Sequence, residues 1–486
     1  MTEPADKSSR RLLVSAALAT AAFGLALAFR VPFGIPDEWV WRPNRLSARL
    51  WPSVAAGPCL VAVVWLACRP VQVGPRVRAV FLVLLVLAAF ALQCSLLNAI
   101  GLPWVTPGAI VASPVATTYY SVSLDIRDPA RWLANYPEQM RTLPYHARTH
   151  PPGFPLFFLA LRRATAVLVP HPSGPMRDIA DAYRQFGIGP TPTDAAAAIA
   201  GAVLIGLLGA LSLLPAYLLG RHLIGAEAAL FSACLMASTP ALLLFGPSSD
   251  EIVLTLAVAT LALSYSAWRS SSLPQAFAAG LVFALGLFFS FGLLALAGWL
   301  LVWAGLGIVR SDDHSVTTRR ALRMAAAGVA GLAIFYVALY YAVGYRAVAV
   351  AREALLAHHG VTTGEAARTY WKWILMDPLE CAAFMGLPLL ITAFWSLRAA
   401  RADPGLSRWR TFLLSWLVTF AVLDISGTVR GEVGRIWLFL LWPAALAAGP
   451  WLAARPRRAE LIALLAGLGV WQAILMRGYL TLYDIF

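Results

Sequence analysis

Long runs without a charged residue are the feature that most limits what this chain can fold into. Residues Ala79 to Ala99 contain no Asp, Glu, Lys or Arg and are apolar on every face of a helix. A hydrocarbon core of about 30 Å needs roughly 20 mainly apolar residues as helix, because every backbone N–H and C=O there needs an internal partner. Such runs recur along the whole chain. The sequence therefore predicts an all-α, polytopic bundle of transmembrane helices.

The composition supports a lipid-covered surface. Of the 486 residues, 60% are hydrophobic and 13% are charged, whereas soluble proteins are about a quarter charged. A transmembrane β-barrel would instead show segments of roughly 10 residues that alternate between apolar and polar. The lipid bilayer is thus the first expected partner, and helices are the expected spanning elements.

The net charge of +14 does not indicate nucleic acid as a partner. The basic residues are scattered singly or in pairs between apolar runs, and they form no basic patch in the sequence. The five cysteines fall inside or at the ends of predicted spans and form no CxxC pair. We therefore expect neither a disulfide framework nor a zinc site.

The hydrophobic runs predict thirteen spans. They cover residues 12–30, 50–68, 79–100, 194–220, 226–245, 250–268, 274–289, 291–309, 321–343, 379–397, 411–427, 435–454 and 459–477.

Basic residues in short connections predict the orientation, because cytoplasmic loops are enriched in Lys and Arg. They dominate the short connections of one side only, beginning with Lys7, Arg10, Arg11, Arg69, Arg76 and Arg78. We expect a multi-pass protein of the cytoplasmic membrane with a cytoplasmic N-terminus. The odd number of spans places Phe486 on the extracytoplasmic side.

One large extracytoplasmic loop, residues 101–193, stands out among short connections. The cytoplasmic connections contain no GxxxxGKS or GxGxxG pattern, so chemistry driven by cytoplasmic ATP is not indicated. We divide the chain into a two-span N-terminal extension (1–78), a membrane core that includes the loop (79–454) and a C-terminal span (455–486).

The loop is rich in residues that suit the chemistry of sugars. A carboxylate can take a proton from a hydroxyl, cations can stabilise a phosphate leaving group, and aromatic faces can stack on pyranose rings. The candidates within about thirty residues are Tyr119, Tyr120, Asp125, Asp128, His146, Arg148 and His150.

Several of these residues also have a structural interpretation. Asp128 precedes a proline and can cap a short helix over 130–135. His150-Pro-Pro-Gly153 can turn the chain into an interfacial helix over 154–168. His358 and His359 could suggest a metal corner, but adjacent histidines on a helix point apart. A divalent metal is compatible with the sequence but is not indicated by it, and no cofactor is firmly implied.

Three motifs resemble the superfamily C glycosyltransferases, which use polyprenyl-phosphate sugars, and in particular its mannosyltransferase-like members of actinobacterial type. The first is His150-Pro-Pro-Gly153, which opens an apolar helix after a long loop. The second is Phe245-Gly-Pro-Ser-Ser-Asp250-Glu251 at the outer end of a span. The third is Val429-Arg-Gly-Glu-Val-Gly-Arg435 at the outer mouth of a late span. The resemblance extends over roughly residues 79–443.

The resemblance implies an enzyme that moves a sugar from polyprenyl phosphate to the hydroxyl of an extracytoplasmic acceptor with inversion. The acceptor would be a glycan, lipid or protein of the cell envelope. It implies contact between the donor phosphate and Arg435, with Arg430, Arg148 and His150 as further candidates. The residues expected around the cavity and the acceptor are Tyr119, Tyr120, Asp128, His146, Asp250 and Glu432.

The position of the base departs from the family pattern, in which a catalytic aspartate lies early in the first large loop. In this chain the corresponding stretch, Thr117 to Ser123, contains no acid, and Asp125 follows it. An Asp-Glu pair, Asp37 and Glu38, follows the first predicted span instead. We favour Asp125 as the base and keep Asp37, with Glu38, as the alternative.

Other functions remain open on the sequence alone. A transporter or flippase of a lipid-linked substrate would be expected to show internal repeats with paired helix breaks, and we find none in the sequence. A catalytically inactive family member would fit the missing early aspartate. Asp250 can also be a helix N-cap, and the segment from Arg430 to Arg435 can anchor a span at the interface.

Overall fold

The computed structural model describes residues 3–44, 48–69, 74–185, 188–311, 313–360, 368–399 and 404–482. Helices make up nearly all of its regular structure, and the three short strands form a single antiparallel sheet in the order β1-β2-β3. The predicted all-α polytopic bundle is confirmed. Phe486, on which we predicted the position of the C-terminus, lies outside the described residues.

The first part of the chain contains two of the three strands and the loop helices. Its elements are α1 (Glu3–Ala28), β1 (Phe33–Ile35), β2 (Trp39–Pro43), η1 (Ala48–Leu50), α2 (Trp51–Cys68), α3 (Pro75–Asn98), α4 (Val105–Ala112), α5 (Tyr119–Asp125), α6 (Pro129–Ala134), α7 (Tyr136–Gln139), η2 (Met140–Thr142), α8 (Tyr145–Arg148), α9 (Gly153–Leu168) and α10 (Gly174–Gln185).

The remainder builds most of the bundle. Its elements are α11 (Pro192–Leu211), α12 (Leu213–Ile224), α13 (Ala226–Ala237), α14 (Pro240–Leu244), α15 (Asp250–Ser270), α16 (Leu273–Phe289), η3 (Phe291–Leu293), α17 (Leu294–Val309), α18 (His314–Val343), α19 (Ala347–Gly360), α20 (Tyr370–Met385), α21 (Leu387–Ala399), η6 (Pro404–Leu406), α22 (Ser407–Ser426), α23 (Val433–Ile436), α24 (Leu438–Leu441), α25 (Pro443–Ala453), α26 (Arg458–Tyr479) and β3 (Leu480–Thr481).

All thirteen predicted spans fall on helices, but they are not thirteen long helices. Among the described residues, nine helical segments are long and apolar enough to cross a membrane, and a bent pair, α20 with α21, would make a tenth. The other three predicted spans are shorter apolar helices over Ala226–Ala237, Leu273–Phe289 and Leu438–Ala453. The hydrophobic runs therefore gave the positions of the spans better than their lengths.

The predicted span 379–397 differs most from the structure, because α20 and α21 meet at an angle of 100°. Gly386 lies at the break with φ of +91°, a conformation that glycine adopts without steric cost. Gln472 of α26 accepts a hydrogen bond from the Leu387 amide at 2.9 Å and donates to the Ala383 carbonyl at 2.8 Å. It thus satisfies backbone groups that the break frees inside the bundle.

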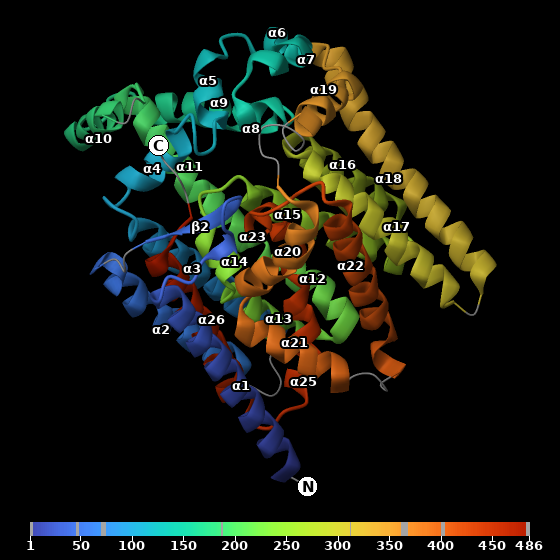
Figure 1. Cartoon of the computed structure of the whole chain (residues 1–486). Coiled ribbons are helices and arrows are strands. Elements are labelled where there is room, and N and C mark those ends of the chain that lie inside the picture. The colour runs from blue at the N-terminus through green and yellow to red at the C-terminus, as the bar shows by residue number, and fades with distance from the viewer. Residues whose placement is uncertain are drawn as a thin grey trace.

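The small sheet joins the segment after α1 to the segment after α26. Phe33 to Ile35 pair with Trp39 to Trp41, and β3 pairs with β2, so the end of α26 and the end of α1 lie at the same end of the bundle. Figure 1 shows the N-terminus at the opposite end. In addition, α1 packs on α21 and α26, and α2 packs on α3 and α26.

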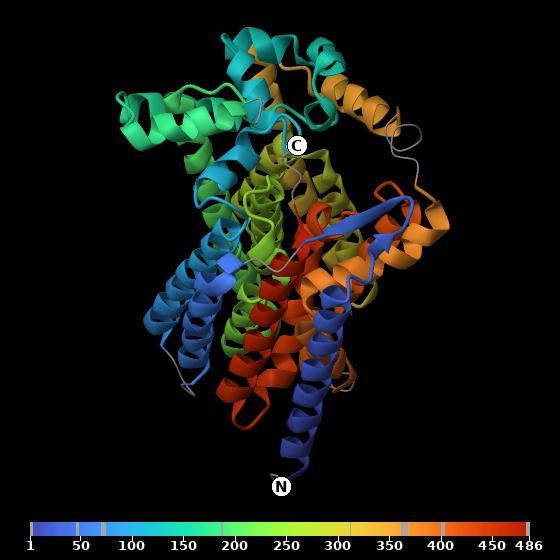
Figure 2. The ribbon, with the colours of Figure 1, turned by 60° about the vertical axis from the view of Figure 1, so that its left-hand side comes forward.

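The loop helices cover one end of the bundle. Figures 1 and 2 show α5 to α10 together above that end, with α19 beside α6 and α7. We call this end the loop face. Helix α18 stands at the edge of the molecule, and Gly331 is its one buried residue. This exposure is what a helix in contact with lipid requires.

Candidate functional site

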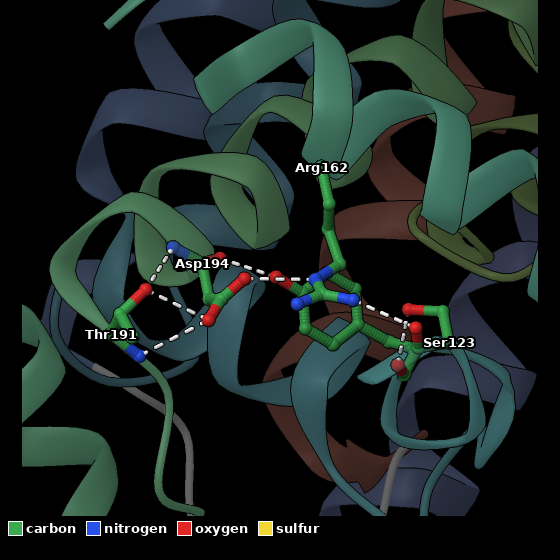
Figure 3. A network of polar contacts seen from close by, with 5 residues as sticks. Ser123, Arg162, Thr191 and Asp194 are labelled. Carbon is green, nitrogen blue, oxygen red and sulfur yellow. Dashed lines mark hydrogen bonds and ion pairs between the residues drawn. The ribbon is translucent and has the colours of Figure 1, made fainter. Parts of the chain in front are cut away.

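The loop is fixed to the bundle by a polar network around Arg162 of α9. The Nε of Arg162 donates to Asp194 Oδ1 at 2.8 Å, and one terminal nitrogen donates to the Ser123 carbonyl at 2.7 Å. Asp194 also accepts from the amide and hydroxyl of Thr191 in a capping box at the start of α11. Figure 3 shows how these contacts join α9, α11 and the end of α5. They fix α5, which begins with Tyr119, and α9, which follows His150.

The His150-Pro-Pro-Gly153 segment forms the turn into α9, as the sequence predicted. The Nδ1 of His150 lies 2.9 Å from the His146 carbonyl, and the hydroxyl of Tyr136 donates to the His150 carbonyl at 2.8 Å. At Gly153 an added Cβ would lie 2.3 Å from the Phe288 carbonyl oxygen at the end of α16. The turn is therefore pressed against the bundle at a position that only glycine fits.

Tyr119, the first residue of α5, packs against this turn. Its ring centroid lies 5.8 Å from the His150 ring and 4.8 Å from the Phe154 ring, and it is 5% exposed. Burial raises the pKa of its phenol above the ordinary value. The Tyr119 hydroxyl is thus a neutral group at physiological pH.

Asp250 opens α15 directly after the Gly-Pro-Ser-Ser turn. It is the first residue of the helix and not its N-cap, which is Ser249 without a side-chain bond. The Ser248 hydroxyl accepts from the Asp250 amide at 3.3 Å and donates to Asp250 Oδ2. The next residue, Glu251, is fully buried, and the amide nitrogen of Gln93 lies 3.2 Å from both of its carboxylate oxygens. These contacts fix the start of α15.

Arg435 links this helix to the third motif. Its Nε lies 3.7 Å from Asp250 Oδ2, and one terminal nitrogen donates to Glu432 Oε2 at 2.8 Å. Glu432, the N-cap of α23, thus pairs with a residue three positions further along the chain. Both side chains are mostly buried, with 17% of Arg435 and 27% of Glu432 exposed.

The charge of Arg435 acts on the pKa values of Tyr119, His146 and His150, so the contacts of Arg435 and those of His150 lie near each other. We call the six predicted site residues of these four segments the polar cluster. They are Tyr119, His146, His150, Asp250, Glu432 and Arg435.

The two histidines of the cluster are neutral at physiological pH. Burial lowers the pKa of His146 to about 3, and the charge of Arg435 acts in the same direction. Burial also lowers the pKa of His150, although the His146 carbonyl and the Asp250 carboxylate oppose that shift. Neutral imidazoles can both donate and accept hydrogen bonds, so they can bind a polar ligand without adding charge.

The ion pairs continue beyond the cluster to Arg368. Its guanidinium lies 3.6 Å from Glu432 and over the rings of Trp39 and Trp373, at 5.3 and 5.2 Å. Asp250, Arg435, Glu432 and Arg368 therefore alternate in sign. The sequence did not indicate Arg368, because it belongs to no motif and precedes an aromatic run that is typical of a membrane interface.

The Asp-Glu pair lies in the three-residue loop between β1 and β2. Glu38 accepts hydrogen bonds from Lys372 Nζ at 2.8 Å, the Thr369 amide at 2.8 Å and Trp373 Nε1 at 2.7 Å. The bond from Lys372 is the main reason that the pKa of Glu38 falls to about 2. Glu38 thus anchors the hairpin on α20, whereas Asp37 is exposed with φ of +68°.

Asp125, our favoured base, is the last residue of α5 and is exposed. The contact that joins α5 to the cluster is the ring contact between His150 and Tyr119, which lies at the other end of the helix from Asp125. The predicted role of Asp125 stays a prediction.

Two further predicted residues take structural positions. Asp128 caps α6 by accepting from the amides of Ala130 and Arg131 at 3.1 and 3.2 Å, which confirms the capping interpretation. The hydroxyl of Tyr120 donates to the Asp194 carbonyl at 2.5 Å within the network around Arg162. Tyr120 therefore points away from its neighbour Tyr119, into the packing of α9 and α11.

The other two predicted phosphate ligands are Arg430 and Arg148. Arg430 donates to the carbonyls of Gly427 at 3.1 Å and Arg368 at 2.5 Å and lies 5.5 Å over the Tyr370 ring. These contacts hold its guanidinium against the backbone of Gly427 and Arg368. Arg148 ends α8, is half-buried and lies in sequence between the two cluster histidines.

The fold and the cluster define a polytopic helical membrane protein whose loop face contains two neutral histidines and a chain of ion pairs. Across the described ranges no group of three or more His, Cys, Asp or Glu side chains is arranged to hold a metal ion. The candidate site contains two imidazoles, a phenol and two carboxylates paired with Arg435.

Among the comparisons with known proteins, the comparison with solved structures gives matches. No protein-family model and no curated protein matches the chain. Thirteen chains of known structure match, among them the crystal structure of the Archaeoglobus fulgidus oligosaccharyltransferase in complex with zinc and sulfate. That match has 14% sequence identity and a TM-score of 0.25, and it covers 71% of this chain and 53% of the other. The chain thus spans about half the length of that structure.

Proposed function

We propose that this protein is a glycosyltransferase that takes a sugar from a polyprenyl-phosphate donor at the loop face. One observation carries the proposal. Segments far apart in the sequence, each singled out by resemblance to superfamily C glycosyltransferases, contribute to a single polar cluster, in which Arg435 approaches Asp250 to 3.7 Å. In this proposal the loop face is extracytoplasmic, as the distribution of basic residues predicts.

The proposed reaction is a single displacement. An acceptor hydroxyl oxygen attacks the anomeric carbon, the bond from that carbon to the phosphate oxygen breaks, and the phosphate leaves with the electron pair. The configuration at the anomeric carbon is inverted. Arg435 stabilises the charge that develops on the departing phosphate oxygen, since a cation aimed at developing charge lowers the barrier.

In this proposal Asp250, and not Asp125 or Asp37, is the general base that accepts the proton of the acceptor hydroxyl. A general base must lie within hydrogen-bond reach of the proton that it takes. Asp250 lies beside the proposed phosphate contact, whereas Asp125 and Asp37 are exposed. This choice changes the base that the sequence favoured and keeps the reaction class.

The test uses purified protein in lipid nanodiscs with a radiolabelled polyprenyl-phosphate sugar and a panel of glycan, lipid and peptide acceptors. We expect label in an acceptor and an equal amount of free polyprenyl phosphate. The anomeric configuration of the product, measured by NMR, should be opposite to that of the donor. Release of no polyprenyl phosphate with any donor and acceptor pair would contradict the proposal.

One observation favours a second candidate, a transporter of a lipid-linked substrate. Discontinuous helices at the substrate site are common in transporters, and α20 and α21 form a helix pair bent by 100°. A liposome assay with a polyprenyl-phosphate sugar that carries a fluorescent label on the lipid separates the two functions. Movement of the lipid between leaflets without loss of the sugar would favour the transporter.

The orientation can be tested independently of activity. In a Cys59→Ser background, Asp125→Cys places a thiol on the loop face, and Ser311→Cys places one in the connection between α17 and α18. A membrane-impermeant maleimide applied to intact cells should label the first variant and spare the second. The reverse pattern would place the loop face in the cytoplasm.

A further inference from the structure

Helix α20 carries two buried carboxyl groups that the proposed reaction does not use. Asp377 and Glu380 are 1% and 0% exposed. They lie three residues apart, so both face the same side of the helix. A buried carboxyl group is costly unless hydrogen bonds satisfy it, so their partners indicate what they do.

Both carboxyl groups accept hydrogen bonds from the backbone of the segment that leads into Arg435. Asp377 Oδ1 accepts from the Gly431 amide at 2.8 Å, and Glu380 Oε1 accepts from the Gly434 amide at 2.9 Å. The two bonds fix both ends of a tight turn. Glu432, with φ of +58°, lies inside that turn.

The turn lies directly on α20 and its neighbours. An added Cβ at Gly434 would lie 2.1 Å from the Phe384 ring, and one at Gly431 would lie 2.7 Å from the Trp373 ring. Gly431 also has φ of +76°, which favours glycine. Arg368 also donates to the carbonyl of Arg430. The backbone before Arg435 therefore has little freedom to move.

We infer that Asp377 and Glu380 are positioning residues that hold the Gly431–Gly434 turn so that Arg435 meets the leaving phosphate. The inference rests on the proposed function, in which Arg435 contacts the donor. Gly434 directly precedes Arg435, so a shift of its amide moves the guanidinium. A displacement of about 1 Å at a catalytic group can cost roughly 100-fold in rate.

The kinetic test compares Glu380→Leu, Glu380→Gln, Arg435→Ala and the double variant Glu380→Leu with Arg435→Ala. Glutamine keeps an oxygen that can accept from Gly434, whereas leucine removes it. We expect Glu380→Leu to lower kcat/KM for the donor about 10- to 100-fold, and Glu380→Gln to keep most of it. In the double variant the loss should not exceed that of Arg435→Ala alone, because one residue acts through the other. Full additivity would overturn the inference.

A second readout does not depend on turnover. Hydrogen exchange of the peptide amides at 431–437 should be faster in Glu380→Leu than in the wild type and unchanged in Glu380→Gln. Ser415→Ala is the matched control, because Ser415 accepts a buried hydrogen bond from Trp299 Nε1 at 2.9 Å in the packing of α17 and α22. It should leave both the exchange at 431–437 and the donor KM unchanged.

The outcomes separate the two proposals. If the wild type transfers no sugar, the proposed function fails, and the exchange data still decide whether the carboxyl groups hold the turn. If Arg435→Ala loses activity and Glu380→Leu changes neither kinetics nor exchange, only the positioning inference fails. Should Glu380→Leu not fold, Asp377→Ala removes the other bond and is held to the same expectations.

Discussion

The guanidinium of Arg435 lies 3.7 Å from the carboxylate of Asp250, measured from Nε to Oδ2. The pair joins the start of α15 to α23, so it connects two parts of the loop face that are far apart in the sequence. A phosphate that binds Arg435 competes with Asp250 for the same cation. Donor binding would then leave the Asp250 carboxylate available to accept a proton.

The first prediction concerns the base. Asp250→Asn keeps the size of the side chain but cannot take a proton, and general-base catalysis contributes about 100- to 10,000-fold. We expect a loss of kcat of at least about 100-fold in the radiolabelled donor assay. Asp125→Asn and Asp37→Asn should each keep activity within about threefold, because both residues are exposed. If Asp125→Asn alone were inactive, the base assigned from the sequence would be restored.

The second prediction compares two arginines of the same segment. Removal of one donor aimed at developing charge costs about 100-fold or more in kcat, so Arg435→Ala should lose that much and Arg435→Lys should lose less. Arg430→Ala is the matched control, because Arg430 donates to the carbonyls of Gly427 and Arg368. We expect it to change the melting temperature more than the donor KM. Equal losses of kcat in both variants would show that Arg435 has no specific role.

The sequence predicted much of the fold because a membrane span needs only length and apolarity. Each predicted span therefore fell on one or more helices, and those at α15 and α26 each fell on a single helix. The bend at Gly386 was not predicted, because it depends on the side chain of Gln472, which lies far along the chain and has no local signal. The hairpin over Phe33–Pro43 was missed for a similar reason, since β3 and α20 hold it.

The site was predicted in part. Short motifs led to His150, Asp250 and Arg435, and the residue types of the loop led to Tyr119. In the structure Tyr119 contacts His150, and Arg435 pairs with Asp250. The candidates for the general base were harder to rank, because a sequence does not show which carboxyl group faces the cluster. Asp125 has the better position in the chain, yet it ends α5 on the exposed side.

The third prediction concerns the network around Arg162. A hydrogen bond to a charged group contributes about 1.5–3 kcal/mol, and Arg162 both pairs with Asp194 and donates to Ser123. Arg162→Ala should lower the free energy of local opening of α9 by about 2–3 kcal/mol, measured by native-state hydrogen exchange. Arg163→Ala is the control, because that exposed neighbour has, among the described residues, one hydrogen bond, to the Arg127 carbonyl at 3.3 Å. A similar loss in both variants would mean that the network is not what holds the loop.

The fourth prediction is a dependence of stability on pH. The pKa of His146 falls from 6.5 to about 3 on folding. Between these two pH values His146 is protonated in the unfolded chain and neutral in the folded protein. The free energy of unfolding therefore decreases as the pH falls from 6.5 towards 3. The contribution of Glu38, whose pKa is lowered from 4.5 to about 2, is lost only below 4.5. Between pH 6.5 and 4.5 the effect of His146 can thus be observed separately from that of Glu38.

The measurement is the melting temperature of the detergent-solubilised protein across that interval. His146→Asn removes the titrating group, so its melting temperature should fall less steeply on acidification than that of the wild type. His171→Asn is a control at a histidine in the exposed connection between α9 and α10. If His146→Asn kept the full slope, the buried imidazole of His146 would not be the source of the acid sensitivity.

The fifth prediction concerns the glycine that ends the His-Pro-Pro-Gly turn. A Cβ at Gly153 would lie 2.3 Å from the Phe288 carbonyl oxygen and 3.0 Å from Phe289 Cα, so backbone would have to move. Overpacking of this kind costs about 1–3 kcal/mol. Because His150 lies in the same turn, the movement would also displace its ring from Tyr119. Gly153→Ala should therefore lower both the melting temperature and kcat/KM for the donor.

Gly174→Ala is the matched control, since an added Cβ at the start of α10 meets nothing within 4 Å. It should leave both quantities unchanged or raise the melting temperature slightly, because alanine loses less backbone entropy than glycine. The comparison separates the space at Gly153 from a general effect of losing a glycine in the loop. Wild-type activity in Gly153→Ala would show that the contact between α9 and the end of α16 does not control the position of His150.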